Sequence, residues 1–349
     1  MYLAQAFAAQ RRGEPLTPWQ VERRALRPHD VLIEIDFCGV CHSDVHQARG
    51  EWGRQLFPMV PGHEIVGRVL RTGEAVSLRR AGDRVGVGCF VDSCRRCLSC
   101  QAGLEQYCTQ GMTATYNSVE RDGLTRTYGG YATAIVVDEA YTLSIPEALP
   151  SDAAAPLLCA GITLYSPLRH WKAGPGTRVA VLGLGGLGHV GVRIARAMGA
   201  EVTVLSHSPR KEQDALRLGA HAFHSSTDFA AEVHLRGAFD LILNTVSTGV
   251  DLDALAALLR CDGTLVMLGI SSEPHSIRGF SLIGQRRSLA GSTIGGIAET
   301  QEMLAFCAQH GISCDIERIR MQDINEAYER LLRGDVRYRF VIDMASLRA

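Results

Sequence analysis

Four cysteines lie within fifteen consecutive residues of this chain, in the stretch FVDSCRRCLSCQAGLEQYC. They are Cys94, Cys97, Cys100 and Cys108. Four thiolates can surround one tetrahedral Zn²⁺, and a shell closed by four protein ligands leaves no position for a substrate. The main alternative is an iron–sulfur cluster, whose bacterial pattern separates its last two cysteines by three residues and then has proline. Here the last gap is seven residues and threonine follows, so the spacing predicts a structural zinc site.

A second set of potential metal ligands is spread along the chain: Cys41, the adjacent pair His63 and Glu64, and Cys159. Taken singly, each has an ordinary interpretation as a buried thiol or a hydrogen-bonded histidine. Two cysteines and one histidine are also a ligand set of catalytic zinc, in which the fourth position takes water or substrate. Glu64 could exchange into that position, and Asp44 could accept the second ring N–H of His63 and fix its tautomer. The set therefore indicates a place where chemistry occurs.

A glycine-rich turn in the middle of the chain has the spacing of a dinucleotide-binding loop. Residues 183–188 read GLGGLG, directly after the apolar segment 178–182 and before a stretch with helical periodicity. In such a loop the glycines allow the tight turn, the close approach of a pyrophosphate and the packing of helix on strand. A glycine-rich turn without a ligand is the alternative, but the flanking patterns favour the nucleotide. The residues expected to contact it are Gly183, Gly185, Gly186, Leu187 and Gly188.

The end of the next strand-like segment, 201–205, indicates which dinucleotide binds. An NAD site needs an acidic residue there to accept a hydrogen bond from the ribose 2′-hydroxyl. The chain instead has Ser206 and Ser208, followed by Arg210 and Lys211. Hydroxyls and cations suit a 2′-phosphate, so the sequence favours NADP(H) over NAD(H). The alternative is that the two cations only form a solvated helix start, where they would oppose the helix dipole.

The elements that must position these residues change in kind along the chain. The first part has β-branched segments between Gly/Pro turns, typical of a β-rich domain. Its strand-like segments are 31–37, 64–71, 83–88 and 131–137. From residue 178 strands and helices alternate, which predicts a parallel sheet covered by helices on both faces. The expected strands there are 178–182, 201–205, 239–244 and 264–268, and helices are expected after the glycine-rich loop and at 209–218, 252–260 and 298–310.

Bulk composition bounds the class of protein. The chain has 349 residues, too many for one ordinary core, so two domains are expected. Its net charge of −1 gives no electrostatic case for nucleic acid or an anionic membrane surface. No apolar run is long enough to span a bilayer and the N-terminus lacks the pattern of a signal peptide, which favours the cytoplasm. The 11 cysteines are an odd number in a large chain, so metal binding is a better explanation than a disulfide framework.

Several motifs together resemble one enzyme family. Residues 62–73 read GHEIVGRVLRTG, which is similar to the signature of the zinc-containing medium-chain alcohol dehydrogenases. CGVCHSD at 38–44, LLCAGIT at 157–163 and the glycine-rich loop resemble the cinnamyl alcohol dehydrogenase branch. The likeness continues through NEAY at 325–328 and RYRFVID at 337–343. Within that branch the chain is most similar to bacterial broad-range NADPH-dependent aldehyde reductases.

The resemblance implies an α/β protein with two domains. A GroES-like, β-rich catalytic domain is expected at 1–150 and 292–349 and includes the structural zinc loop 94–108. A Rossmann domain, a doubly wound parallel sheet that binds NADP(H), is expected at 151–291, with the substrate in the cleft between the two. Two Zn²⁺ ions per subunit are implied. Cys41, His63 and Cys159 would hold the catalytic zinc beside Glu64, and the four clustered cysteines would hold the structural zinc.

The resemblance also implies a proton relay and a substrate pocket. Ser43 and His46 match the relay of the family. The positions that match its pocket are Gln47, Trp52, Cys89 and Ile294. Trp52 could stack on an aromatic substrate or could only anchor its loop. Ala114 stands where plant lignin enzymes usually carry a bulky aromatic residue, which argues against a dedicated lignin-aldehyde substrate.

The expected function is therefore the reversible reduction of aldehydes to primary alcohols, with zinc polarising the carbonyl group and NADPH giving the hydride. Two alternatives remain open at this point. One is an NAD-dependent polyol or sugar-alcohol dehydrogenase, against which Ser206 argues. The other is a non-catalytic nucleotide- or zinc-binding relative, against which the complete ligand and relay sets argue. The family further implies a homodimer through the edge of the Rossmann sheet, near 282–294, with no nucleic-acid or membrane partner.

Overall fold

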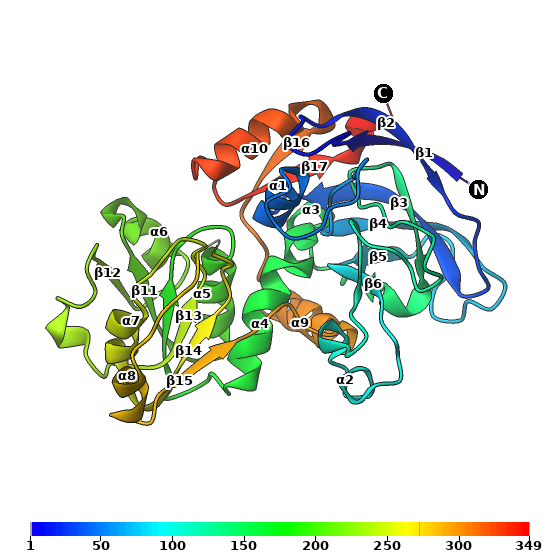
Figure 1. The fold of residues 1–349 in the computed structure, drawn as a ribbon. Coiled ribbons are helices and arrows are strands. Elements are labelled where there is room, and N and C mark those ends of the chain that lie inside the picture. Colours follow the sequence, from blue (N-terminus) through cyan, green and yellow to red (C-terminus); the bar gives the residue numbers. More distant parts are fainter. Residues whose placement is uncertain (1, 272, 349) are drawn as a thin grey trace. The chain divides into compact units, whose positions relative to one another are not determined.

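The computed structural model describes residues 2–271 and 273–348, and the chain divides into two compact units. Unit 1 comprises Met1–Cys159 and Gly295–Ala349, and unit 2 comprises Ala160–Ile294. Figure 1 shows a β-rich unit built from both ends of the chain and an α/β unit built from its middle.

Unit 1 is built around a sheet with the strand order β16-β17-β3-β4-β5-β9, in which β8 also pairs with β3. Only the β16–β17 pair is parallel. The strands of this sheet are β3 (Asp30–Gly39), β4 (Ile65–Thr72), β5 (Arg84–Val87), β8 (Ala134–Asp138), β9 (Leu143–Ser144), β16 (Ile316–Arg320) and β17 (Arg339–Asp343). Two smaller sheets pair β1 (Tyr2–Ala8) with β2 (Thr17–Arg23) and β6 (Phe90–Asp92) with β7 (Thr113–Ala114).

Short helices connect these strands and carry several candidate site residues. The helices of unit 1 are α1 (His42–Ala48), α2 (Leu98–Gln101), α3 (Ser151–Ala154), α9 (Ile297–Gln309) and α10 (Ile324–Leu332). Its 3₁₀ helices are η1 (Glu105–Tyr107), η2 (Glu139–Tyr141), η3 (Ala155–Leu158), η6 (Met321–Asp323) and η7 (Met344–Leu347). Strand β3 is central because Val31, Ile33 and Ile35 are fully buried and it pairs with three neighbours. Its C-terminal end leads directly into the first metal-ligand segment.

Unit 2 is a six-stranded parallel sheet with the order β12-β11-β10-β13-β14-β15. Its strands are β10 (Arg178–Leu182), β11 (Glu201–Ser206), β12 (Ala222–Ser225), β13 (Phe239–Asn244), β14 (Leu259–Met267) and β15 (Ser288–Gly291). Its helices are α4 (Ala160–His170), α5 (Gly188–Ala197), α6 (Glu212–Arg217), α7 (Leu252–Leu258) and α8 (Gly279–Ile283), with the 3₁₀ helices η4 (Pro209–Lys211) and η5 (Val233–Leu235). The order reverses beside β10, and a reversal of this kind creates the ligand crevice of doubly wound sheets.

The core of unit 2 explains why its strands are apolar on both faces. Residues of β10, β13 and β14, among them Ala180, Ile242 and Leu265, pack with α7 in one buried cluster. The adjacent residues Val181 and Leu243, whose side chains point to the opposite face of the sheet, are also fully buried. A sheet covered by helices on both faces has this pattern. The expected GroES-like plus Rossmann fold is confirmed in both units.

Several boundaries differ from the sequence prediction. The cofactor domain was expected at 151–291, whereas the compact unit 2 runs from Ala160 to Ile294 and residues 151–159 lie in unit 1. There Asp152 accepts a hydrogen bond from the Arg318 Nε at 2.6 Å. The expected helix at 252–260 ends at Leu258, because Leu259 already starts β14. No helix within the described residues is long and apolar enough to cross a membrane.

Candidate functional site

The dispersed ligand set comes together in unit 1. One potential ligand atom from each of Cys41, His63, Glu64 and Cys159 lies within 4.8 Å of the others, and all four residues are buried. Cys41 follows the end of β3, the pair His63 and Glu64 immediately precedes β4, and Cys159 follows η3. Because β3 and β4 are neighbours in the sheet, their adjacent ends bring the first three ligands together. Two thiols, an imidazole and a carboxylate at this separation fit a tetrahedral zinc site.

Asp44 holds this ligand set in place through four hydrogen-bond contacts. Its Oδ1 lies 3.1 Å from the His63 Nδ1 and accepts a hydrogen bond from the Gly62 N–H at 3.0 Å. Its Oδ2 accepts from the Cys41 N–H at 2.9 Å and from the Tyr131 hydroxyl at 3.3 Å. With Nδ1 engaged, the His63 Nε2 is the atom left for a metal, and its tautomer is set. The role expected for Asp44 therefore has a specific geometry.

Glu64 is held by an arginine that the sequence did not point to. Its Oε1 accepts a hydrogen bond from Arg339 of β17, and both side chains are almost fully buried. Its Oε2 is buried without a hydrogen-bond partner among the described residues. Burial raises the pKa of Glu64 to about 8, against the opposing charge of Arg339. A buried carboxylate oxygen with no partner is unfavourable, and a cation bound at this set would compensate it.

The two thiols of the set behave as a coupled pair. A hydrogen bond from Cys159 lowers the pKa of Cys41, and the same contact raises the pKa of Cys159. Both thiols are buried. Zinc binds the thiolate form, so metal binding would release protons from this pair.

Gly39 provides a specific test of the Glu64 position. A Cβ built at Gly39 would lie 1.9 Å from the Glu64 Oε2 and 2.9 Å from its Cβ. Gly39→Ala is therefore expected to displace the carboxylate, lower the free energy of unfolding by about 1–3 kcal/mol through overpacking and change zinc retention against a chelator. Gly249→Ala is the control, because a Cβ there meets nothing within 4 Å. Unchanged zinc retention and thermal midpoint in Gly39→Ala would contradict this account of Glu64.

The clustered cysteines form a second potential metal group. One sulfur from each of Cys94, Cys97, Cys100 and Cys108 lies within 4.8 Å of the others. The Cys97 N–H donates to the Cys94 Sγ at 3.3 Å, and the Cys94 N–H donates to the Cys108 Sγ at 3.4 Å. Backbone N–H groups of Cys100 and Thr109 lower the pKa of Cys97 to about 5. Donors aimed at sulfur favour thiolates, so the donor set fits Zn²⁺ with a closed shell.

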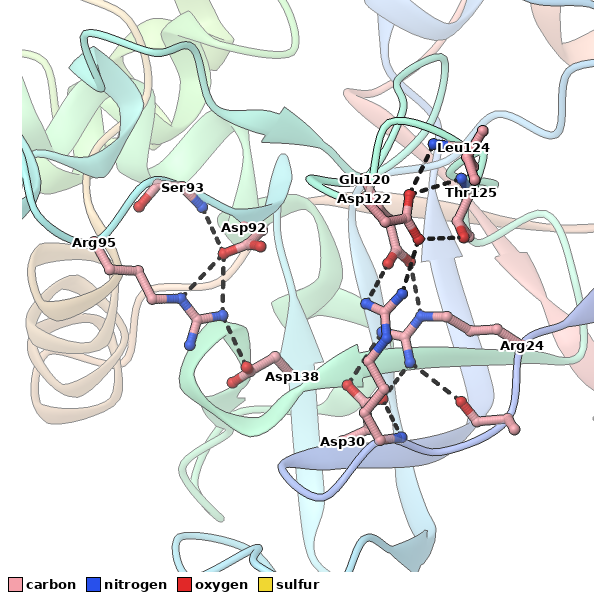
Figure 2. Close-up of polar contacts among 12 residues, drawn as sticks. Arg24, Asp30, Asp92, Ser93, Arg95, Glu120, Asp122, Leu124, Thr125 and Asp138 are labelled. Carbon is pink, nitrogen blue, oxygen red and sulfur yellow. Dashed lines mark hydrogen bonds and ion pairs between the residues drawn. The ribbon is translucent and has the colours of Figure 1, made fainter.

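Side-chain contacts attach the segment 94–108, called the cysteine lobe, to the sheet of unit 1. Figure 2 shows Arg95 donating to Asp92 and to Asp138. The guanidinium carbon of Arg95 also lies 5.0 Å from the centre of the Tyr141 ring. The Ser93 hydroxyl lies 2.9 Å from the Tyr141 hydroxyl and 3.1 Å from the Cys100 Sγ. The metal group is thereby joined to β8 and η2, which supports a structural rather than a catalytic role.

A second charge network, also drawn in Figure 2, positions residues 120–125, which follow the clustered cysteines in the sequence. Arg24 pairs with Asp30 and with Glu120, whose Oε1 accepts from the Arg24 Nε at 2.7 Å. Asp122 closes the tip of this segment by accepting from the Leu124 and Thr125 N–H groups at 2.9 and 2.8 Å. Arg121 lies between Glu120 and Asp122 in the sequence, and its Nη2 is 3.9 Å from the Cys108 Sγ. A cation is thus held beside a four-thiolate group that would carry net negative charge with zinc.

The expected relay and pocket residues lie on or near α1. The Ser43 Oγ is 3.5 Å from the Cys41 Sγ. The His46 ring stacks on Trp52 with ring centroids 4.8 Å apart, and its Nδ1 contacts the Glu51 carboxylate. This ring contact places Trp52 beside His46, the histidine expected in the relay, which the sequence could not show.

The remaining pocket positions are more dispersed. The Gln47 Oε1 accepts from the Asn117 amide at 2.6 Å. Cys89 hydrogen-bonds to Cys159, which lowers the pKa of Cys89, so its thiol lies next to the metal set. Ile294 belongs to unit 2 and is buried with a φ of 38°. Gln47, Trp52 and Cys89 therefore belong to unit 1, each with a different contact, and Ile294 is the last residue of unit 2.

The glycine-rich loop follows the carboxyl end of β10, beside which the strand order of unit 2 reverses. Gly183 follows β10 with a φ of 92°, and a Cβ at Gly188 would lie 2.0 Å from the Gly183 carbonyl oxygen. Only glycine fits both positions. A Cβ at Gly185 would meet nothing within 4 Å, which leaves space beside the loop where α5 begins. That arrangement suits a pyrophosphate at a helix N-terminus.

The residues that would discriminate the cofactor lie at the end of β11. Ser206 is the last residue of β11 and its Oγ accepts from the Ser208 N–H at 3.1 Å. Arg210 and Lys211 follow in η4. No carboxylate stands at this strand end, where an NAD site would need one. Hydroxyls and cations at this position fit a 2′-phosphate.

Comparisons with known proteins show which family the chain resembles. Residues 27–147 match the alcohol dehydrogenase GroES-like domain and residues 186–309 match the zinc-binding dehydrogenase family. NADP-dependent alcohol dehydrogenase C 1 of Mycolicibacterium smegmatis is 60% identical over 100% of both chains. Aldehyde reductase YahK of Escherichia coli is 54% identical over 98% of both. The crystal structure of a cinnamyl alcohol dehydrogenase of Helicobacter pylori, complexed with NADP(H), is 41% identical, covers 98% of both chains and has a TM-score of 0.92.

The chain belongs to the zinc-containing medium-chain alcohol dehydrogenases. Within them it lies in the branch of the cinnamyl alcohol dehydrogenases and the bacterial aldehyde reductases. The family predicted from its motifs is therefore confirmed.

Proposed function

We propose that this protein is an NADP(H)- and zinc-dependent oxidoreductase that reduces aldehydes to primary alcohols and catalyses the reverse oxidation. The observation that carries the proposal is the buried set of Cys41, His63, Glu64 and Cys159. A closed structural set alone would suit any zinc protein, whereas two thiols, one histidine and an exchangeable carboxylate leave a position for substrate. The substrate class is that of the alcohol dehydrogenase and aldehyde reductase relatives, which share 54–60% of their residues with this chain.

The protein residues supply the geometry for this reaction. When bound, Zn²⁺ would polarise a carbonyl oxygen as a Lewis acid and NADPH would supply the hydride. Cys41, His63 and Cys159 would hold the metal, and Asp44 would keep the His63 ring in one tautomer through its 3.1 Å contact. The Gly183–Gly188 loop would bind the pyrophosphate, while Ser206 and Arg210 would donate hydrogen bonds to the 2′-phosphate.

The residues of α1 would move the proton. In the reductive direction the Ser43 hydroxyl would donate a proton to the product oxygen, and His46 would restore it. The short separation of Ser43 from Cys41 places that hydroxyl next to the metal set. The contact between the His46 Nδ1 and Glu51 would leave the Nε2 atom for proton transfer. In the oxidative direction the same groups would remove the alcohol proton.

The proposed function is tested by NADPH consumption with a panel of aliphatic and aromatic aldehydes. The protein is used with its zinc content measured, before and after complete chelation. We expect turnover with NADPH that disappears with the metal and returns when Zn²⁺ is added back. Undiminished turnover after full zinc removal would contradict a zinc-dependent mechanism, and bound NADPH without turnover on any aldehyde would favour a non-catalytic binder.

The preference for NADP(H) has its own expected result. Ser206→Asp places a carboxylate at the end of β11, where it repels a 2′-phosphate and accepts from a 2′-hydroxyl. The ratio of kcat/KM with NADPH to kcat/KM with NADH is expected to fall by about 10- to 100-fold, since one charge-assisted contact contributes about 1.5–3 kcal/mol. Thr227→Asp, at an exposed position of the same unit, is the charge-matched control. An unchanged ratio in Ser206→Asp would place cofactor discrimination elsewhere.

We also propose that the protein is a homodimer through the edge of the sheet in unit 2. Strand β15 is the edge strand, and its partner-free side offers backbone groups for pairing. Nearby on α8, Phe280 is 85% exposed and Ile283 is 75% exposed. Light scattering on the purified protein should give twice the chain mass, and Phe280→Asp should lower it; a monomer at micromolar concentration would refute the proposal.

We propose the cytoplasm as the compartment. All 11 cysteines are free in the structure, including the exposed Cys261. Thiols of this number persist in a reducing compartment. Fractionation of the producing cells tests this, and recovery of the protein outside the cytoplasmic fraction would contradict it.

A further inference from the structure

Asn117, which lies outside the ligand, relay and pocket sets predicted from the sequence, joins α1 to the segment that follows this helix. The Asn117 Oδ1 accepts a hydrogen bond from the Leu56 N–H at 2.8 Å, and the Asn117 Nδ2 donates to the Gln47 Oε1 at 2.6 Å. Gln47 belongs to α1, and Leu56 lies between α1 and the metal-ligand pair that precedes β4. Both ends of the Asn117 amide are therefore occupied by neighbours in unit 1.

The directions of these two hydrogen bonds depend on each other. A backbone N–H can only donate, so the side-chain atom of Asn117 that faces Leu56 must be the oxygen. The amide nitrogen of Asn117 then faces Gln47 and can only donate, so Gln47 must present its own oxygen. The Gln47 Nε2 remains as a donor, and it has no hydrogen-bond partner among the described residues. One backbone N–H thus sets the orientation of two side-chain amides.

The backbone around Asn117 is anchored beside the proposed metal set. Tyr116 is buried, and its ring stacks on that of His63 with the centroids 5.8 Å apart. Asn117 has a φ of 55°, in the left-handed region that asparagine adopts more readily than most other residues. Its amide therefore starts from a fixed point next to a proposed zinc ligand.

Gln47 lies about one helical turn from the proposed metal set. The Ser43 Oγ is 3.5 Å from the Cys41 Sγ, and Gln47 follows Ser43 by four positions on α1. Residues four positions apart lie on the same side of a helix, separated by about 6 Å along its axis. A ring substituent of an aromatic aldehyde lies at a comparable distance from the carbonyl oxygen. A carbonyl group held at the metal set would therefore place such a substituent near Gln47.

We propose that Asn117 is a positioning residue that determines substrate specificity, because it orients the Gln47 amide so that its NH2 group donates to the substrate. This inference rests on the proposed function as an aldehyde reductase. The favoured substrates are aromatic aldehydes whose ring carries a hydrogen-bond acceptor, such as a second carbonyl oxygen.

The test compares substrates that differ in the acceptor but hardly in shape. Acetylbenzaldehyde and isopropylbenzaldehyde form such a pair, and both the 3- and the 4-substituted compounds are used. The measured quantity is the ratio of kcat/KM for the acetyl compound to that for the isopropyl compound, on the zinc-loaded protein with NADPH. Intrinsic differences in reactivity cancel when this ratio is compared between variants. The corresponding unreactive benzamides give a second ratio, from their Kd values measured by calorimetry in the presence of NADP⁺.

Asn117→Asp is the decisive substitution. The carboxylate can still accept from the Leu56 N–H, but it offers Gln47 only an acceptor, so the Gln47 amide turns over and presents its oxygen to the substrate. We expect the acetyl-to-isopropyl ratio to fall about three- to tenfold at one ring position at least, the change that one neutral hydrogen bond makes. The fall should appear in KM rather than in kcat, because this contact is present before the reaction.

Two further variants and a control complete the test. Asn117→Gly tolerates the left-handed φ and releases the Gln47 amide, and Gln47→Leu removes the donor while leaving Asn117 in place. Both should lower the same ratio. Gln20→Glu, an amide-to-carboxylate change at an exposed position of unit 1, is the charge-matched control and should leave the ratio unchanged. Thermal midpoints show which variants are folded.

The possible outcomes separate this inference from the proposed function. An unchanged ratio in folded Asn117→Asp, an unchanged ratio in Gln47→Leu, or an equal fall in Gln20→Glu would each overturn the role of Asn117. Absence of turnover on every aldehyde would contradict the proposed function, while the Kd ratios of the benzamides would still report the orientation of the Gln47 amide.

Discussion

Cys159→Ala should lower kcat/KM for aldehyde reduction by on the order of a thousandfold or more, because it would remove one of the three proposed protein ligands of the zinc that would polarise the substrate. The remaining carboxylate of Glu64 is already held by Arg339. The glycine-rich loop lies in unit 2 and contains none of these ligands, so NADPH binding should persist. Turnover, NADPH fluorescence and zinc content per chain are measured on the same preparation.

The matched control is Cys307→Ala, because Cys307 is fully buried in α9 and belongs to neither metal group. It removes a buried thiol of the same size and should leave both zinc ions and turnover in place. If Cys159→Ala retained two zinc ions and turned over within tenfold of the unsubstituted protein, Cys159 would not be a ligand of the catalytic metal.

Cys100→Ala should act on stability rather than directly on chemistry. The Cys100 Sγ lies 3.5 Å from the Cys97 Sγ and 3.8 Å from the Cys94 Sγ, so its loss opens the closed shell. Metal binding free energy at such a site is folding free energy. A loss of about 3–5 kcal/mol would lower the thermal midpoint by on the order of 10 °C for a unit of this size. Calorimetry with zinc quantification measures both quantities.

The contrast between the two substitutions separates the metal roles. Cys100→Ala is expected to keep measurable turnover at low temperature with one zinc ion left per chain. Equal loss of folding in Cys100→Ala and Cys159→Ala would contradict the division into a structural and a catalytic metal. An unaltered thermal midpoint in Cys100→Ala would contradict the structural role alone.

The ligand types could be predicted from the sequence because zinc chemistry restricts them severely. The four clustered cysteines are local, so their spacing was informative without a fold. Cys41, His63 and Cys159 are far apart in sequence, and the motifs around them carried the prediction. Their side chains meet because β3 and β4 are neighbours in the sheet, and because η3, which directly precedes Cys159, packs against these strands.

The supporting residues could not be predicted in the same way. Arg339 lies 275 residues from Glu64, and its segment has only the pattern of a buried strand. A buried arginine in such a strand is a signal, since arginine is rarely buried unless paired, but the sequence does not name its partner. Arg95 and Arg121 look like ordinary surface charges until the segments they contact are known.

The strands of unit 2 followed from their apolar pattern, since a parallel sheet covered on both faces has continuous hydrophobic runs. The strand 178–182 was predicted with the bounds that the structure has. Short helices were harder to predict from the sequence. The expected helix at 209–218 is a 3₁₀ helix followed by an α-helix, because Pro209 and the turn at Ser208 constrain its first residues.

The different sequence separations in the two metal groups bear on how the protein would lose its zinc. Cys41 and Cys159 are 118 residues apart, whereas Cys94 and Cys108 are only 14 apart. In an unfolded chain, the entropy of closing the longer loop opposes metal retention by about 2 kcal/mol more than that of closing the shorter one. The long-range set therefore depends on the folded sheet more strongly than the short cysteine segment does. As the chain unfolds, the ion of the long-range set would leave first, and the ion of the cysteine segment would leave later, when that segment itself opens.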